Sequence, residues 1–218
     1  MKVEELFNGV YRLDGKIATE NLDRGKKVYN EELRTVDKTE YRMWNPYRSK
    51  LGAAILKGLK TFKIRRDSNV LYIGAATGTT TSHVSDIVRD GRVYCVELSE
   101  RNMRDLINVC ESRRNMMPIL ADANFPEKYE EYVGQCDILY QDASARDQAE
   151  LILRNSRFIE SGGYIYFVIK SQSIDISEKP EAVFKSELDK LKGEFELIET
   201  VDLEPYDSLH LFAVLRKK

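Results

Sequence analysis

The sequence predicts an α/β protein whose core is a parallel sheet, and three observations lead to this prediction. Short apolar runs alternate with segments of helical periodicity between residues 69 and 191. The first run ends in a turn of small residues at 74–80, and the second ends at the acidic residue Glu97. Runs that are almost wholly apolar are typical of parallel strands covered by helices on both faces.

The beginning of the chain differs in character from the rest. It is polar, and Asn-Gly and Asp-Gly turn signals stand at 8–9 and 14–15, which predicts short strands joined by tight turns. We expect a small β-rich N-terminal domain over residues 1–50 and a larger domain over residues 51–218. Apolar residues at helical spacing predict a helix over 49–59.

Five strands follow, and the segments between them carry apolar residues on one helical face. The predicted strands are 69–73, 92–97, 116–120, 137–140 and 164–169. Two further runs, 195–203 and 209–215, are joined by a segment too short for a crossover helix, so we expect an antiparallel hairpin. Five parallel strands and a C-terminal antiparallel hairpin are the usual plan of a Rossmann-like methyltransferase fold.

Residues at the carboxyl ends of these strands suit an adenosyl cofactor, because ligands of such sheets lie at that edge. Gly74 and Gly78 are spaced G-x-x-x-G, whereas the loop of a nicotinamide dehydrogenase would read G-x-G-x-x-G. S-adenosylmethionine has a ribose and an adenine but no pyrophosphate. Glu97 could accept from both ribose hydroxyls, Asp122 from the adenine amine, and the Ala123 amide could donate to the ring. Helix capping is the alternative role of these acids.

Several further polar residues are hard to explain by structure alone. Thr79 and Thr80 stand where the next helix begins, and helix N-termini bind polar ligand atoms. Asp142 follows the fourth strand, and Lys170 ends the strongly apolar fifth strand. His210 begins the last strand, and Lys50 follows an aromatic, basic segment. The alternative is that Lys170 extends from the sheet edge into solvent and that His210 caps the hairpin.

Composition restricts the class of protein. The chain has a net charge of −2, but residues 41–66 hold eight basic residues and no acid, which indicates one basic face for a polyanion or a solvated helix surface. The cysteines, expected to be buried free thiols of a cytoplasmic protein, are Cys95, Cys110 and Cys136. No metal site is expected, since the two histidines are far apart in sequence. No apolar run is long enough to cross a membrane.

Specific motifs cover nearly the whole chain. They are GKKVY at 25–29, WNPYRSKL at 44–51, YIGAATGTTTSHV at 72–84, NMMPILAD at 115–122, DQA at 147–149, GGYIYFVIK at 162–170 and LEPY at 203–206. With these motifs the sequence closely resembles the fibrillarins, the RNA 2′-O-methyltransferases of box C/D ribonucleoproteins, in their short archaeal form. The resemblance implies a Rossmann-like S-adenosylmethionine-dependent methyltransferase and a small N-terminal β-domain.

The resemblance also implies the residues of the site. The implied catalytic residues are Lys50, Asp142, Lys170 and His210. The expected cofactor-binding residues, with the glycine turn included, are Gly74, Ala75, Gly78, Thr79, Thr80, Glu97, Leu98, Asp122, Ala123, Asp142, Ala145 and Gln148. The family usually reads Val-Ala-Gln-Pro after the catalytic acid, whereas this chain reads Ala-Ser-Ala-Arg at 143–146. The family's glutamine is therefore missing at Ala145, and Gln148 is a nearby glutamine that remains.

The activity implied is S-adenosylmethionine-dependent methylation of a ribose 2′-hydroxyl in rRNA, and possible substrates include tRNA. Lys170 would lie nearest the hydroxyl, Asp142 would orient Lys170, and Lys50 and His210 would orient the nucleotide. The implied partners are a guide RNA with its target, a Nop-type scaffold protein and a kink-turn-binding ribosomal-type protein. We expect poor site-specific activity from the isolated chain.

Two other functions compete with this one. A stand-alone ribose methyltransferase of the heat-shock type would carry Lys-Asp-Lys-Glu, but the fourth position here is His210. A non-catalytic ribonucleoprotein subunit could have kept the fold and lost the chemistry, and the altered segment 143–146 leaves this open. Calorimetry with S-adenosylmethionine would separate an enzyme from a subunit that no longer binds the cofactor.

Overall fold

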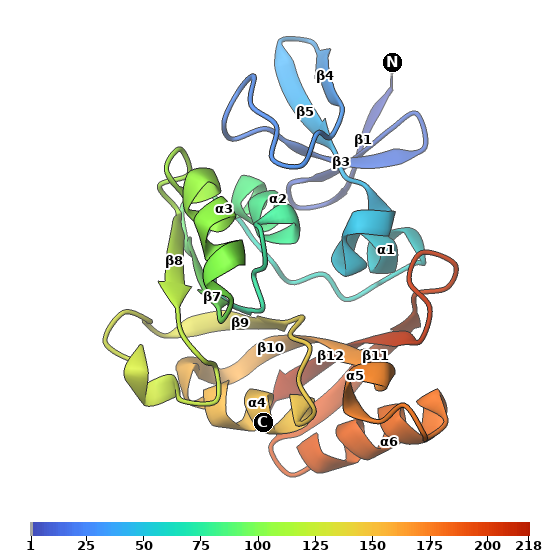
Figure 1. The fold of residues 1–218 in the computed structure, drawn as a ribbon. Coiled ribbons are helices and arrows are strands. Elements are labelled where there is room, and N and C mark those ends of the chain that lie inside the picture. The colour runs from blue at the N-terminus through green and yellow to red at the C-terminus, as the bar shows by residue number, and fades with distance from the viewer. Residues whose placement is uncertain (1) are drawn as a thin grey trace.

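The computed structural model describes residues 2–218 as two sheets that lie against the same group of helices (Figure 1). The N-terminal sheet is antiparallel, with strand order β1-β2-β3-β5-β4. Its strands are β1 (Val3–Phe7), β2 (Val10–Leu13), β3 (Lys16–Glu20), β4 (Leu33–Val36) and β5 (Thr39–Met43). The short strands predicted at the start of the chain are confirmed.

The second sheet has seven strands in the order β11-β12-β10-β9-β6-β7-β8. They are β6 (Asn69–Ile73), β7 (Arg92–Glu97), β8 (Met116–Leu120), β9 (Cys136–Gln141), β10 (Ile159–Lys170), β11 (Phe195–Asp202) and β12 (His210–Lys217). The strands β6 to β10 are parallel, and β11 pairs with β12 as an antiparallel hairpin. Because β12 also runs antiparallel to β10, it alone is reversed in this sheet. The predicted fold class is confirmed.

Helices cover both faces of the seven-stranded sheet (Figure 1). The α-helices are α1 (Lys50–Leu56), α2 (Thr79–Ile87), α3 (Glu100–Cys110), α4 (Gln148–Asn155), α5 (Ser171–Ile174) and α6 (Pro180–Leu191). Three 3₁₀ turns are η1 (Pro46–Arg48), η2 (Pro126–Lys128) and η3 (Ser156–Phe158). Helix α1 is shorter than predicted, because Gly58 has φ +92°, a left-handed conformation that ends helices. None of these helices, within residues 2–218, is long and apolar enough to span a bilayer.

Alternating residues of the central strands supply two separate cores, since successive side chains of a strand point to opposite faces. One face carries aromatic rings: Tyr72 and Tyr140 stack with their centroids 4.4 Å apart, and Tyr166 lies against Phe212. The opposite face carries mainly aliphatic side chains, together with Phe167 and Phe195, and packs under α4 and α6. Cys95 and Cys136 are buried as expected, but Cys110 is only half-buried, so the expectation of three buried thiols is wrong for Cys110.

A buried ionic network joins the N-terminal sheet to α2. The guanidinium of Arg42, on β5, lies 2.6 Å from Glu31 and 2.8 Å from Asp86, and all three side chains are fully buried. Arg113 reaches the second oxygen of Asp86 at 2.7 Å. Each buried charge therefore has a partner of opposite sign, which is the condition for burying it. The prediction of one basic face over residues 41–66 is wrong for Arg42, which is internal.

Other basic residues of that segment are also neutralised. Arg65 pairs with Asp67, and Arg66 pairs with Asp90. Four cations of the segment form no ion pair with any carboxylate of residues 2–218: Arg48, Lys57, Lys60 and Lys63. The excess positive charge is thus smaller than the sequence indicates, and Arg48 is the member of this group closest in sequence to Lys50.

His83 lies in the same interface, and its burial predicts a pH-dependent stability. Its Nδ1 is 2.7 Å from the Thr19 hydroxyl and its Nε2 is 2.7 Å from the Tyr29 hydroxyl. Burial, with the positive charges of Arg42 and Arg113, holds the pKa of His83 well below its ordinary value. The unfolded chain takes up a proton below about pH 6.5 and the folded chain does not.

The free energy of unfolding should therefore fall as the pH drops below about 6.5, by up to about 1.4 kcal/mol per pH unit. Urea denaturation at pH 7.5 and 5.5 measures this. The His83→Gln variant should show a smaller difference between the two pH values than the wild type. An equal difference in both proteins would contradict the assignment.

Candidate active site

The carboxyl ends of the parallel strands surround a cavity of about 590 Å³. Residues that follow β6, β7, β8 and β9 line it, and Lys170 closes one side from the end of β10. This is the edge at which the sequence predicts a ligand. Eight of the predicted cofactor-binding or catalytic residues line the cavity: Gly74, Glu97, Leu98, Asp122, Ala123, Asp142, Ala145 and Lys170.

Gly74 allows the ends of β6 and β9 to approach closely. It has φ +81°, and a Cβ at this position would lie 2.9 Å from the carbonyl oxygen of Asp142 and 2.9 Å from the amide nitrogen of Ala143. No larger residue fits without moving the backbone of the loop that carries Asp142. Gly74 therefore places Asp142 at the cavity, because only glycine allows this close backbone approach.

Glu97 is held rigidly at the end of β7. Its Oε2 accepts the amide of Ala76 at 2.8 Å, its Oε1 accepts the amide of Ser99 at 2.8 Å, and the residue is 7 % exposed. Oε1 also accepts a longer hydrogen bond from the Asn102 side chain at 3.4 Å, so the lone pair open to a ligand is the second one of Oε2. The exposed side chain of Leu98 stands beside it. A fixed carboxylate and an adjacent apolar side chain fit the ribose diol and the flat adenine of an adenosyl group.

Asp122 and Ala123 continue this arrangement after β8. Oδ1 of Asp122 accepts from the amide and the side chain of Asn124, which folds the loop back on itself. The carbonyl of Ala123 accepts from Asn155 of α4 at 2.9 Å. Both residues line the cavity. The donor and acceptor types along the cavity therefore fit the cofactor predicted from the sequence.

Five other predicted cofactor residues do not line this cavity: Ala75, Gly78, Thr79, Thr80 and Gln148. Thr80 donates to the Ser49 hydroxyl at 3.0 Å and so joins the starts of α2 and α1. Gln148 is buried, and its side chain accepts from the amide of Lys170 at 2.9 Å and donates to the carbonyl of Ala145 at 3.0 Å. Gln148 thus fixes the backbone on either side of the cavity rather than facing it.

The four residues predicted to be catalytic are connected, with Asp207 as a fifth member, in a series of contacts that we call the ion-pair chain. Lys170 Nζ lies 2.8 Å from Asp142 Oδ1, and Lys50 Nζ lies 3.5 Å from the same oxygen. Lys50 from α1 also lies 3.5 Å from Oδ2 of Asp207, whose Oδ1 is 2.5 Å from Nδ1 of His210. Lys170 and His210 are register partners on β10 and β12. Strand pairing and the start of α1 therefore bring together residues that are up to 160 positions apart.

Asp207 and Ser144 are members of this cluster that the sequence analysis missed. Asp207 connects Lys50 to His210, and the Ser144 hydroxyl accepts from Lys170 Nζ at 3.2 Å. Burial raises the pKa of Asp207, but the hydrogen bond and charge of His210 and the charge of Lys50 outweigh this and hold the pKa below its ordinary value. The position of Asp207 three residues before His210 was the available signal.

Comparison with known proteins agrees with this geometry. The fibrillarin family model matches residues 1–218. The chain belongs to the fibrillarin family. A fibrillarin-like rRNA/tRNA 2′-O-methyltransferase from Methanocaldococcus jannaschii is 42% identical over 221 residues, which is 98% of this chain and 96% of that protein.

Solved fibrillarin structures have the same fold. Aeropyrum pernix fibrillarin with natively bound S-adenosyl-L-methionine is 44% identical and superposes with a TM-score of 0.91, covering 99% of this chain and 98% of that one. A fibrillarin in a fibrillarin/Nop5p complex is 38% identical with a TM-score of 0.91, covering 99% of this chain and 100% of that one. The fibrillarin segment that departs from the usual family sequence, 143–146, lies partly in the cavity wall through Ala143, Ser144 and Ala145.

Proposed function

We propose that this fibrillarin is an S-adenosylmethionine-dependent RNA ribose 2′-O-methyltransferase and the catalytic subunit of a box C/D guide-RNA ribonucleoprotein. One observation carries the proposal: Asp142 and Lys170 belong both to the wall of the cavity and to the ion-pair chain. A cofactor in that cavity and a nucleotide at the ion-pair chain would therefore meet at Asp142 and Lys170. The names of the similar proteins support the same substrate class.

When bound, the cofactor supplies a methyl group already activated on a sulfonium. Glu97 holds the ribose of the cofactor, and Asp122 with Ala123 holds the adenine. Asp142 and Lys170 fix the place where the target ribose oxygen must lie, in line with the methyl group. Such orientation can lower the activation free energy of methyl transfer by up to roughly 7–11 kcal/mol. Positioning of the two reactants is therefore the main contribution of the protein.

Lys170 enters the reaction as the neutral amine, after releasing a proton to solvent, and takes the proton of the 2′-hydroxyl as the new oxygen–carbon bond forms and the methyl group leaves the sulfonium. Nζ of Lys170 donates to the carbonyl of Asp142 at 2.7 Å and to the hydroxyl of Ser144 at 3.2 Å, and Oδ1 of Asp142 lies 2.8 Å away as its ion-pair partner. The ammonium that the proton transfer forms is therefore stabilised by two hydrogen bonds and by the negative charge of Asp142. Lys50 and His210, connected by Asp207, orient the nucleotide on the other side of Asp142.

The proposed assembly includes a Nop-type scaffold protein, a guide RNA and a kink-turn-binding protein. A fibrillarin/Nop5p complex supports the scaffold protein. Arg42, Arg65 and Arg66 are neutralised by carboxylates and the net charge of the chain is −2, so we expect the isolated chain to bind phosphates weakly. Pairing with a guide RNA, rather than contacts of this chain with bases, would then select the nucleotide.

Calorimetry with S-adenosylmethionine tests the cofactor site. The Glu97→Gln variant should bind the cofactor roughly 10- to 100-fold more weakly, because a lost hydrogen bond to a charged group costs about 1.5–3 kcal/mol. Glu100→Gln removes an exposed carboxylate at the start of α3 and serves as the matched control. Unchanged affinity in Glu97→Gln, or no binding by the wild type, would contradict the proposed site.

A further inference from the structure

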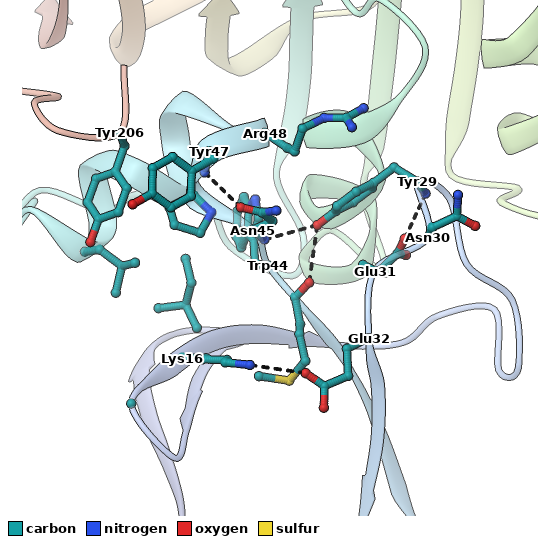
Figure 2. Close-up of a pocket in the computed structure, with 15 residues that line it drawn as sticks. Lys16, Tyr29, Asn30, Glu31, Glu32, Trp44, Asn45, Tyr47, Arg48 and Tyr206 are labelled. Carbon is teal, nitrogen blue, oxygen red and sulfur yellow. Dashed lines mark hydrogen bonds and ion pairs between the residues drawn. The ribbon is translucent and has the colours of Figure 1, made fainter. Parts of the chain in front are cut away.

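The two ends of the ion-pair chain are held in place by different kinds of contact. Asp207 lies in the loop before β12, and the neighbouring Tyr206 packs edge to face on Tyr47 of η1, with the ring centroids 5.1 Å apart (Figure 2). Lys170 stands at the other end, as the last residue of β10, with its side chain 11 % exposed. Its place depends on polar contacts of its backbone and of its Nζ.

The backbone of Lys170 extends past the strand that pairs with β10 on one side. The last register pair between β9 and β10 joins Gln141 to Phe167, and β10 continues to Lys170. On the other side β12 still accompanies it, since Lys170 is the register partner of His210. On the β9 side, the backbone groups of this buried residue need another partner, because unpaired buried groups cost free energy.

The side chain of Gln148 supplies that partner. Its Oε1 accepts the amide of Lys170 at 2.9 Å, and its Nε2 donates to the carbonyl of the same residue at 3.3 Å. A side-chain amide can replace a strand residue in this way, because it offers both an acceptor and a donor. Gln148 is itself fully buried, and its own carbonyl accepts from the side chain of Gln141 at 2.8 Å.

The same side chain also fixes the wall of the cavity at the strand ends. Its Nε2 donates to the carbonyl of Ala145 at 3.0 Å, and Ala145 lines that cavity. Ala145 belongs to the loop 142–146, whose Asp142 and Ser144 accept from Nζ of Lys170. Lys170 is therefore attached to this loop twice, through its backbone by Gln148 and directly through its Nζ.

We propose that Gln148 is a positioning residue for methyl transfer, which holds Lys170 and the loop 142–146 in one fixed arrangement. This inference rests on the proposed function, because that function assigns the proton of the 2′-hydroxyl to Lys170. Gln148 does not line the cavity, so it acts through the backbone of Lys170 and of the loop. Its loss leaves Nζ free to move relative to the cavity wall, where the methyl group must lie.

Single-turnover methyl transfer by the assembled complex, with saturating cofactor and RNA, measures this effect. Gln148→Met keeps the length of the side chain and removes its hydrogen bonds. The rate constant should fall roughly 10- to 100-fold, because misplacement of a reacting group by about 1 Å costs on the order of 10²-fold. Gln148→Asn, whose amide is one methylene shorter, disturbs the core less and should lower the rate constant by at least about threefold.

Asn115→Leu is the matched control for a buried amide. The side chain of Asn115 donates to the carbonyl of Ser85 at 2.8 Å and accepts from its hydroxyl at 2.8 Å. Neither residue lines the cavity. Asn115→Leu should lower the free energy of unfolding, as Gln148→Met does, but leave the rate constant of the assembled complex unchanged.

A second readout does not depend on methyl transfer. The isolated chain is treated with an amine-reactive acylating reagent, and mass spectrometry follows the acylation of Lys170 relative to Lys185, an exposed lysine of α6. In the wild type, Lys170 should react slowly because its Nζ is hydrogen-bonded and little exposed. Gln148→Met and Gln148→Asn should raise its relative rate of acylation by at least about threefold, since local opening becomes easier.

Wild-type rate constants in the Gln148 variants at saturating cofactor would overturn the inference, and so would unchanged acylation of Lys170. If Gln148→Met does not fold, Gln148→Asn decides by the same two measurements. An active wild-type complex with unaffected Gln148 variants refutes only the role of Gln148. Faster acylation of Lys170 in the variants, with a wild-type complex that transfers no methyl group, refutes only the proposed function.

Discussion

Replacement of Lys170 by alanine should lower the rate of methyl transfer by about 10²–10⁴-fold, the usual contribution of a positioned acid–base group. Lys170 is fixed more firmly than the other members of the ion-pair chain. Its amide donates to Gln148, its Nζ donates to the Asp142 carbonyl and the Ser144 hydroxyl, and its side chain is 11 % exposed. Lys170 Nζ lies 2.8 Å from Asp142 Oδ1, whereas Lys50 Nζ lies 3.5 Å from the same oxygen.

The measurement is single-turnover methyl transfer by the assembled complex, with cofactor affinity determined separately. The affinity should change little in Lys170→Ala, since the cofactor is itself positively charged at sulfur and gains nothing from an ammonium group. Lys185→Ala is the control, because Lys185 is an exposed residue of α6. A Lys170→Ala complex with the wild-type rate would remove Lys170 from the mechanism.

Replacement of Arg42 by alanine should lower the free energy of unfolding by about 3–5 kcal/mol, the typical effect of removing one partner of a buried ion pair. Glu31 would keep only the amide donors of Val28 and Tyr29. Asp86 would keep Arg113 and the Thr19 hydroxyl. The variant would also contain a cavity where the fully buried guanidinium lay.

Urea denaturation of the isolated chain measures this effect. Arg12→Ala is the matched control, because Arg12 forms an exposed pair with Glu4 at 3.9 Å and should contribute less than about 1 kcal/mol. A loss below about 1 kcal/mol for Arg42→Ala would show that the network between the N-terminal sheet and α2 contributes little to stability.

The parallel sheet could be predicted because buried strands need apolar residues on both faces. The predicted bounds of β6, β7 and β8 are confirmed to the residue. The strand β10 begins five residues earlier than predicted, because it continues through a bulge at Gly162 and Gly163. Gly162 has φ +82°, and a Cβ on Gly163 would lie 2.6 Å from Ile159. Both glycines, which lie outside the predicted strand 164–169, are therefore part of β10.

The cavity lining could be predicted where a residue directly ends a strand, as Glu97 and Asp122 do. Contacts between distant segments could not. Lys50 meets Asp207 only because the loop before β12 returns to α1 (Figure 1). Gln148 has the chemistry of a ligand-binding residue, and only the structure shows that its amide is used by the backbone of Lys170 and Ala145. The internal position of Arg42 likewise depends on packing against α2.

We infer that the ion-pair chain directs a methyl group to a ribose 2′-oxygen. The most direct test is transfer of labelled methyl from S-adenosylmethionine, by the assembled complex, to a guided RNA and to the same RNA with a single 2′-deoxy nucleotide at the target. Label should enter the first RNA at the target nucleotide and be absent from the second. Equal labelling of the two RNAs would contradict the claim.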